Sequence, residues 1–380
     1  MSRLALPLAI AGVLAFVLVG AGSGLIVDAL WFRQLGYFVV FRTALAAKIA
    51  TFLLGAAVAS TALVTVGLYV LGHIRERGHV RVVIRRGNGP ETLPELIAPF
   101  AERIPWRGLV VAAAAVVGFL FGLGQSANWE TYLLALYGGA YGAVDPLFGL
   151  DIGFYLFSLP AYRAVVNAAI GIIILCGLLA AALFWLQGAL DFRRPGDLLP
   201  PAAIRLASLL LGLLLLVKSA DYFLGRYELL LAPYGAVFGP GYTASNVRLP
   251  LQWLLSFAAL IGAGLALANW RFGGWRLPVT GVVMVFAASI LSGVIPGVFQ
   301  RLRVRPDELR LEQPYLQRNI EMTRIAYGLD RIETRPFPAK TPLDAAAIAR
   351  NRQTFDNIRL WDPGPLLDTY RQLQLIRLYY

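Results

Sequence analysis

Residues 160–186 have the sequence PAYRAVVNAAIGIIILCGLLAAALFWL, in which Arg163 is the only charged residue. About 20 apolar residues in an α-helix cross the ~30 Å hydrocarbon core of a bilayer, and backbone at that depth must satisfy its own hydrogen bonds. This stretch therefore predicts a membrane-spanning helix. Similar apolar runs predict a bundle of seven such helices: Leu4–Val27, Thr43–Leu71, Leu109–Gly124, Pro160–Leu186, Leu206–Phe223, Leu251–Trp270 and Val279–Phe299.

The composition is also typical of a membrane protein. Hydrophobic residues make up 58% of the 380 residues and charged residues 15%. The net charge of +12 would suggest a nucleic-acid partner in a soluble protein. Here no nucleic-acid-binding motif or aromatic platform accompanies the charge, so we expect no nucleic-acid binding and give the arginines a topological role. We predict an all-α membrane protein.

The loop arginines predict the orientation of the bundle. With the N-terminus in the cytoplasm, the inside segments carry Arg3, Arg75, Arg77, Arg81, Arg85, Arg86, Arg103, Arg107, Arg193, Arg194, Arg205, Arg271 and Arg276. The short outside segments carry only Arg33, Arg42, Arg163, Arg226 and Arg248. Because short loops rich in arginine stay in the cytoplasm, we predict that the N-terminus is inside and the C-terminal segment is outside.

Two parts follow from this topology. Residues 1–299 form the transmembrane domain, and residues 300–380 form a helical extracytoplasmic segment. In that segment Pro314, Pro342 and Pro365 are predicted at first helical positions, and Gly328 is predicted to end the first helix.

Several sequence blocks resemble one known family. They are Trp31–Tyr37, Asp145–Tyr155, Tyr234–Thr243, Arg305–Leu309, Pro314–Ile320, Ala326–Asp330 and Asn357–Tyr370. Together they resemble uncharacterised protein family 0182, multi-pass bacterial and archaeal membrane proteins without an established activity. The resemblance implies a longer protein with a large extracytoplasmic domain after the spans, so we expect this chain to be its N-terminal membrane part together with the start of that domain, residues 300–380.

Two charged residues lie near the outer end of the fifth span. Lys218 and Asp221 are three residues apart, share a helix face and are expected to pair. Ionisable groups within spans are candidates for a transport path. Local pairing is the simpler interpretation, because lysine reaches the membrane surface with its long side chain.

The acidic residues near the outer face include two candidates for an enzyme site, Asp145 and Asp151. Paired carboxylates could serve glycoside hydrolysis or calcium binding. Aspartate beside Gly and Pro has an ordinary turn-forming role, which we favour. We also expect the outer acids, among them Asp221 and Glu228, to pair with Arg163, Arg226 and Arg248.

The inner loop offers candidate contacts for anionic lipid headgroups: Arg75, Arg77, Arg81, Arg85 and Arg86. Its two histidines, His73 and His79, lack the partners of a zinc site. We predict no catalytic, cofactor-binding or metal-binding residues and no cofactor. Glycine pairs four residues apart favour close helix packing within the bundle, or an oligomer as the alternative: Gly20/Gly24, Gly118/Gly122 and Gly293/Gly297.

We expect a multi-pass protein of the plasma membrane that is surrounded by lipid. Its predicted function is a non-enzymatic anchor or scaffold that presents the extracytoplasmic segment to envelope proteins. A transporter or channel is the first alternative and would need a polar lining built from Asn167, Lys218 and Asp221. An envelope enzyme is the second and would need Asp145 or Asp151 to converge with another carboxylate.

Overall fold

The structure, a computed structural model, describes residues 20, 22–75, 105–186, 199–233, 238–336, 344–359 and 362–374. These residues form helices, turns and two isolated β-bridges, without an extended strand. The prediction of an all-helical chain is confirmed for this part. By length and composition, the described residues contain six helices that could cross a membrane: Phe38–His73, Trp106–Ser126, Phe154–Leu186, Pro201–Glu228, Ala244–Phe272 and Arg276–Ala326.

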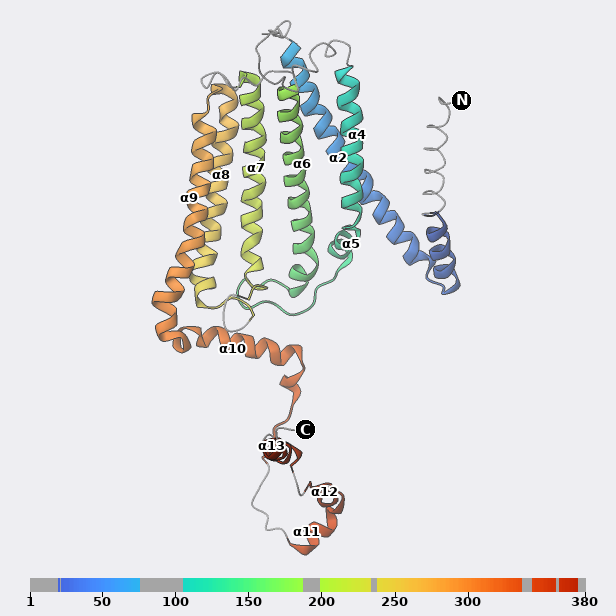
Figure 1. Cartoon of the computed structure of the whole chain (residues 1–380), viewed down its shortest axis with the longest axis vertical. Helices are drawn as coiled ribbons and strands as arrows, with labels where there is room; N and C mark the ends of the chain where they lie inside the picture. The colour runs from blue at the N-terminus through green and yellow to red at the C-terminus, as the bar shows by residue number, and fades with distance from the viewer. Residues whose placement is uncertain are drawn as a thin grey trace. The chain divides into compact units, whose positions relative to one another are not determined.

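The long helices form one bundle. They are α2 (Phe38–Arg75), α4 (Trp106–Ser126), α6 (Leu159–Leu186), α7 (Pro201–Glu228), α8 (Leu249–Phe272) and α9 (Arg276–Phe299). Neighbours in the bundle follow the order α4, α2, α6, α7, α8 and α9 (Figure 1). The short helix α5 (Trp129–Tyr137) follows α4. All predicted spans from the second to the seventh lie within these helices.

The first predicted span, Leu4–Val27, lies largely outside the described residues. Residues 22–34 are helical, and a turn at Gly36, with φ of +77°, separates them from α2. Gly36 suits this turn because glycine adopts positive φ without steric cost. The number of seven spans and their orientation stay predictions.

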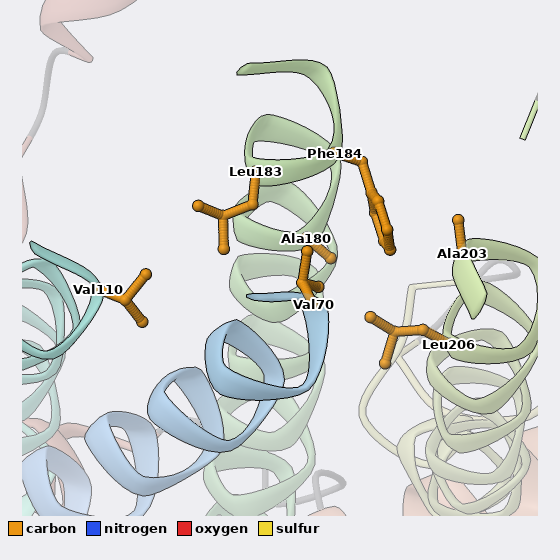
Figure 2. Close-up of a cluster of buried hydrophobic side chains, with 7 residues drawn as sticks. All are labelled: Val70, Val110, Ala180, Leu183, Phe184, Ala203 and Leu206. Atoms are coloured by element: carbon orange, nitrogen blue, oxygen red, sulfur yellow. The ribbon is translucent and has the colours of Figure 1, made fainter. Parts of the chain in front are cut away.

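Apolar side chains fill the contacts between helices. Figure 2 shows one such cluster, formed by Val70 of α2, Val110 of α4, Ala180, Leu183 and Phe184 of α6, and Ala203 and Leu206 of α7. The outward faces are apolar as well: Leu54, Leu178 and Phe286 are each more than 60% exposed. Contiguous apolar surface of this kind is unfavourable in water, and a bilayer would cover it.

One glycine pair explains how closely two helices pack. A Cβ atom on Gly122 of α4 would lie 2.7 Å from the carbonyl oxygen of Phe52 and 2.8 Å from Cβ of Ala56, both in α2. Gly118 is equally confined against Ser60. The expected packing role is therefore confirmed for this pair. Gly293 and Gly297 of α9 have open space beside them.

Three π-helical segments interrupt the long helices: η1 (Phe154–Ser158), η2 (Ala244–Arg248) and η3 (Gln300–Val304). In each, the N–H of the following residue bonds to the carbonyl five residues earlier, and a proline comes next: Pro160, Pro250 or Pro306. Proline lacks an N–H, and its ring clashes with the carbonyl four residues earlier in an α-helix. The wider π turn relieves that conflict, so these helices continue through their prolines.

The chain divides into two compact units, Met1–Met322 and Thr323–Tyr380. In the first unit, η4 (Arg305–Asp307) leads from η3 into α10 (Glu308–Ala326), which runs across the bundle helices (Figure 1). The prediction for Pro314 is wrong, because this proline lies inside α10. The prediction for Gly328 is confirmed: α10 ends just before it, and its φ is +66°.

The described residues of the second unit form four further short elements. They are η5 (Leu329–Arg331), α11 (Ala345–Arg350), α12 (Arg352–Asp356) and α13 (Pro363–Gln374). The Asp344 carboxylate caps α11 by accepting a 2.5 Å hydrogen bond from the N–H of Ala347. Helix α13 begins two residues before Pro365, and Pro342 lies outside the described residues.

Candidate functional site

The candidate residues whose side chains the structure describes gather at one end of the bundle. We call it the loop end: the end where α6 and α8 begin, where α7 and α9 finish, and where all three π-helical segments lie. π-Helical turns are rare and occur often at functional sites. The loop end therefore combines the described candidate residues with a backbone geometry that is typical of functional sites.

An ion-pair network joins α6 to α7 at this end. The guanidinium of Arg163 contacts the carboxylates of both Asp221 and Glu228, and Lys218 pairs with the second oxygen of Asp221. The side chains of Arg163 and Asp221 are 19% and 17% exposed, so water screens their attraction only in part. The predicted pair of Lys218 with Asp221 is present, and Arg163 completes it as expected.

Asn167, the third residue of the polar lining that a transporter would need, does not join this network. Asn167, one turn below Arg163 on α6, is exposed on the outside and makes no contact with the network. The ammonium of Lys218 lies 4.8 Å from the ring centre of Tyr222, a cation–π contact. Each charged side chain of the network lies beside one of opposite charge, as expected for a structural link between two helices.

Asp145 organises the loop between α5 and η1. Its buried carboxylate accepts hydrogen bonds from the N–H groups of Leu147, Phe148 and Leu150 at 2.6–2.9 Å, and from the hydroxyl of Tyr155 at 2.7 Å. Burial raises the pKa of this carboxyl, but the four hydrogen bonds outweigh burial and hold the pKa below its usual range. The side chain therefore stays ionised as the centre of a turn.

Asp151 organises the other half of the same loop. It accepts hydrogen bonds from the N–H groups of Tyr141 at 2.8 Å, Gly142 at 2.9 Å and Gly153 at 2.6 Å. These bonds lower the pKa of Asp151. Asp145 and Asp151 share no hydrogen-bond partner among the described residues, and backbone N–H groups of the loop engage both carboxylates, which is the turn-forming role that the sequence favours.

The aromatic surroundings of Arg226 are a feature that sequence reasoning missed. This arginine is only 7% exposed, and its guanidinium lies 3.7 Å from the ring centre of Phe223, 4.1 Å from that of Trp253 and 4.8 Å from that of Tyr227. Its Nε donates to the carbonyl oxygen of Phe223, and Nη2 donates to the Tyr227 hydroxyl. Within the described residues no carboxylate pairs with it, so the expected ion pair of Arg226 is absent there. Phe223, three residues before Arg226, and Tyr227, the residue after it, were the sequence signal that could have predicted this aromatic environment.

Helix α10 is fixed to the loop end by one polar stripe, which the sequence interpretation also missed. Residues 312, 315 and 319 are spaced along one face of the helix. Three contacts join them to the segment 238–246: Tyr242 N–H to Glu312 at 2.9 Å, Asn246 Nδ2 to the Tyr315 hydroxyl at 3.0 Å, and Asn319 Nδ2 to the Phe238 carbonyl at 2.9 Å.

Gly241 makes the first of these contacts possible. A Cβ atom there would lie 2.6 Å from Oε2 of Glu312, so a larger residue would push the carboxylate away from Tyr242. The Tyr242 ring also stacks on Phe299, the last residue of α9. The start of α8, the end of α9 and α10 therefore form one packed unit.

The remaining candidates cannot be placed at a site. Arg75 ends α2, but its side chain lies outside the described residues, as do Arg77, Arg81, Arg85 and Arg86 entirely. His73 Nδ1 contacts the carbonyl oxygen of Tyr69 within its own helix. In the described part of the chain, no three His, Cys, Asp or Glu side chains gather as a metal site requires.

Comparison with known proteins places the chain in a family. It is 40% identical over 372 residues to a UPF0182 protein of Cupriavidus necator, covering 98% of this chain and 40% of the relative. It is also 40% identical over 372 residues to a UPF0182 protein of Bradyrhizobium diazoefficiens, covering 97% of this chain and 40% of the relative. A UPF0182 protein of Geobacter sulfurreducens is 37% identical over 380 residues, covering 96% of this chain and 41% of the relative.

The chain thus spans about 40% of the length of these curated relatives. No solved structure matches it. The model of one family, described as an uncharacterised protein family, matches residues 5–380. The chain therefore belongs to the uncharacterised protein family UPF0182.

Proposed function

We propose that this chain is a non-enzymatic membrane anchor that holds the segment after α9 in a fixed position and presents it to partner proteins. The observation that carries the proposal is the polar stripe of α10. Glu312, Tyr315 and Asn319 fasten this helix to the segment 238–246 at the loop end. A flexible linker would not need such contacts.

The packing of the described bundle is consistent with a structural role. The contacts between its helices are made by apolar clusters and small residues, together with pairs such as Ser219 with Ser256 and Ser208 with Asn269. Such hydrogen bonds join helices in an apolar environment. The outward apolar faces suit a multi-pass protein of the cell membrane, and the arginine distribution favours a loop end that faces outside.

The test is crosslinking of the full-length native protein in intact cells, followed by affinity purification and mass spectrometry. We expect recovery of a defined set of envelope proteins. The double variant Glu312→Ala/Asn319→Ala should reduce that recovery several-fold, because α10 loses two of its three polar attachments.

The matched control is Gln317→Ala/Glu321→Ala. It also removes one amide and one carboxylate from α10, but from the exposed face, where these two residues bond only to each other among the described residues. Equal recovery from wild type, stripe variant and control would count against the anchor. Recovery of the protein alone would do so as well.

A transporter is the second candidate, and the ion-pair network favours it. Three charged side chains of that network, Arg163, Lys218 and Asp221, belong to the candidate spans, where ionisable groups often mark a transport path. Flux measured in proteoliposomes with Lys218→Ala and Asp221→Ala tests this alternative. If wild type transports a substrate and both variants lose that flux while they keep their fold, the result would favour a transporter over an anchor.

A further inference from the structure

A small pocket lies at the loop end, between the start of α8 and the segment that follows α9. Its volume is about 220 Å³. Pockets for drug-sized organic ligands typically measure ~300–1,000 Å³, so this one suits a single small polar group. All its lining residues belong to the first compact unit.

The charge of the pocket favours an anion. Three arginines line it, Arg248 from η2, Arg301 from η3 and Arg305 from η4, against one carboxylate, Glu312. That carboxylate already accepts the N–H of Tyr242. Arg301 and Arg305 are exposed and form no ion pair with any residue that the structure describes. Two guanidinium groups are thus left without a counter-charge at the rim.

Neutral donors add to the arginines. The Thr243 hydroxyl donates to Oε1 of Gln300, and no described contact uses the amide nitrogen of Gln300, which keeps two N–H donors. Thr243 and Ala244 belong to the first turn of the long helix that continues as α8, and they line the pocket too. The first turn of a helix favours negative charge through its N–H groups and its dipole.

We propose that this pocket binds a phosphate group. The planar fork of a guanidinium donates two parallel hydrogen bonds to phosphate oxygens, and phosphate has enough oxygens to engage several arginines at once. The two sources of such a group are a phospholipid headgroup and a dissolved phosphate. The position suits the first: Gln300 and Arg301 directly follow Phe299, where the apolar helix α9 ends, and headgroups lie at that level of a bilayer.

The proposal stands apart from the anchor function, because it needs no partner protein, although Glu312 of the α10 stripe also lines the pocket. It is tested on the full chain purified in maltoside micelles, which contain no phosphate. Inorganic phosphate is titrated by calorimetry, and phosphatidylglycerol is added to the micelles and counted by native mass spectrometry.

The test variant is Arg301→Gln/Arg305→Gln, and the matched control is Arg303→Gln/Arg318→Gln. The control removes the same charge from exposed arginines of η3 and α10 that do not line the pocket. The single variant Arg301→Gln replaces the double variant if the latter fails to fold, since this side chain is exposed and makes no described ion pair.

We expect wild type and control to bind at least one probe equally, and the test variant to bind it about tenfold more weakly or worse. Binding of phosphatidylglycerol alone assigns a lipid headgroup, whereas binding of inorganic phosphate assigns a dissolved source. The proposal is overturned if wild type binds neither probe, if test variant and control bind alike, or if acetate displaces phosphate at equal concentration.

Discussion

The hydroxyl of Tyr155 donates a hydrogen bond of 2.7 Å to Oδ2 of Asp145, and both side chains are buried. This contact ties the loop 138–153 to the π-helical segment η1. We predict that Tyr155→Phe lowers the free energy of unfolding by about 1–3 kcal/mol, the usual effect of removing a hydrogen bond to a charged group. Thermal unfolding in detergent measures the change. Tyr162→Phe is the control, because Tyr162 is 52% exposed, and equal shifts for the two variants would contradict the prediction.

The two loop aspartates predict an acid-sensitive fold. Both have a pKa below its usual range in the folded state, whereas an unfolded aspartate titrates near ~3.9. A lowered pKa contributes stability that is present above the unfolded pKa and is lost as the pH falls through the folded pKa. The free energy of unfolding should therefore drop as the pH is lowered below about 4.

Denaturation of the protein at a series of pH values measures this dependence. The variant Asp145→Asn should be less stable at neutral pH and should show a flatter dependence of stability on acid, since one of the two carboxylates with a lowered pKa is gone. The exposed Asp368→Asn serves as the control and should keep the slope of wild type. An unchanged slope in Asp145→Asn would refute the role of this carboxylate.

The two ion pairs of Arg163, with Asp221 and with Glu228, should contribute unequally to the free energy of unfolding. Asp221 is 17% exposed and Glu228 is 46% exposed, so water weakens the second pair more. Double-mutant cycles with Arg163→Gln, Asp221→Asn and Glu228→Gln should give a coupling of about 1–3 kcal/mol for the first pair. The second pair should give about 0–1 kcal/mol. Reversible denaturation in mixed micelles provides the free energies. A larger coupling energy for Arg163 with Glu228 than for Arg163 with Asp221 would contradict the prediction.

Two glycines of similar sequence context should respond differently to a larger side chain. Gly122→Leu should destabilise the bundle by at least about 2 kcal/mol, because α2 lies against this glycine and overpacking forces the helices apart. Gly293→Leu should leave the stability of the monomer within about 0.5 kcal/mol, since the space beside it is open. Thermal unfolding compares the two. A strong effect of Gly293→Leu would point instead to an oligomer contact on this face of α9.

The helices were predictable because hydropathy is a property of contiguous sequence. Each predicted span from Thr43–Leu71 onward lies inside a helix of the structure. Their ends were less predictable. Pro160 marks the start of a predicted span, yet the helix begins earlier and passes through this proline by means of η1. The predicted helix start at Pro314 was wrong for a similar reason, because α10 begins at Glu308 and contains this proline.

The candidate site was predictable only where its residues are close in sequence. Lys218 and Asp221 are one helical turn apart, and the aspartates of the loop 138–153 bond to backbone groups within ten residues. The aromatic surroundings of Arg226 depend on Trp253 of the next helix, and the docking of α10 joins Glu312 to Tyr242. No local pattern shows which distant side chains will meet.

By itself the sequence determined which segments are helical and apolar, because about 20 consecutive apolar residues favour one structure whatever surrounds them. It also determined the family, through blocks spread along almost the whole chain. The tertiary structure alone decided which charges pair, which glycines are confined and where three arginines surround a pocket. Those features arise when helices pack side by side, and packing brings together residues that lie tens of positions apart in the chain.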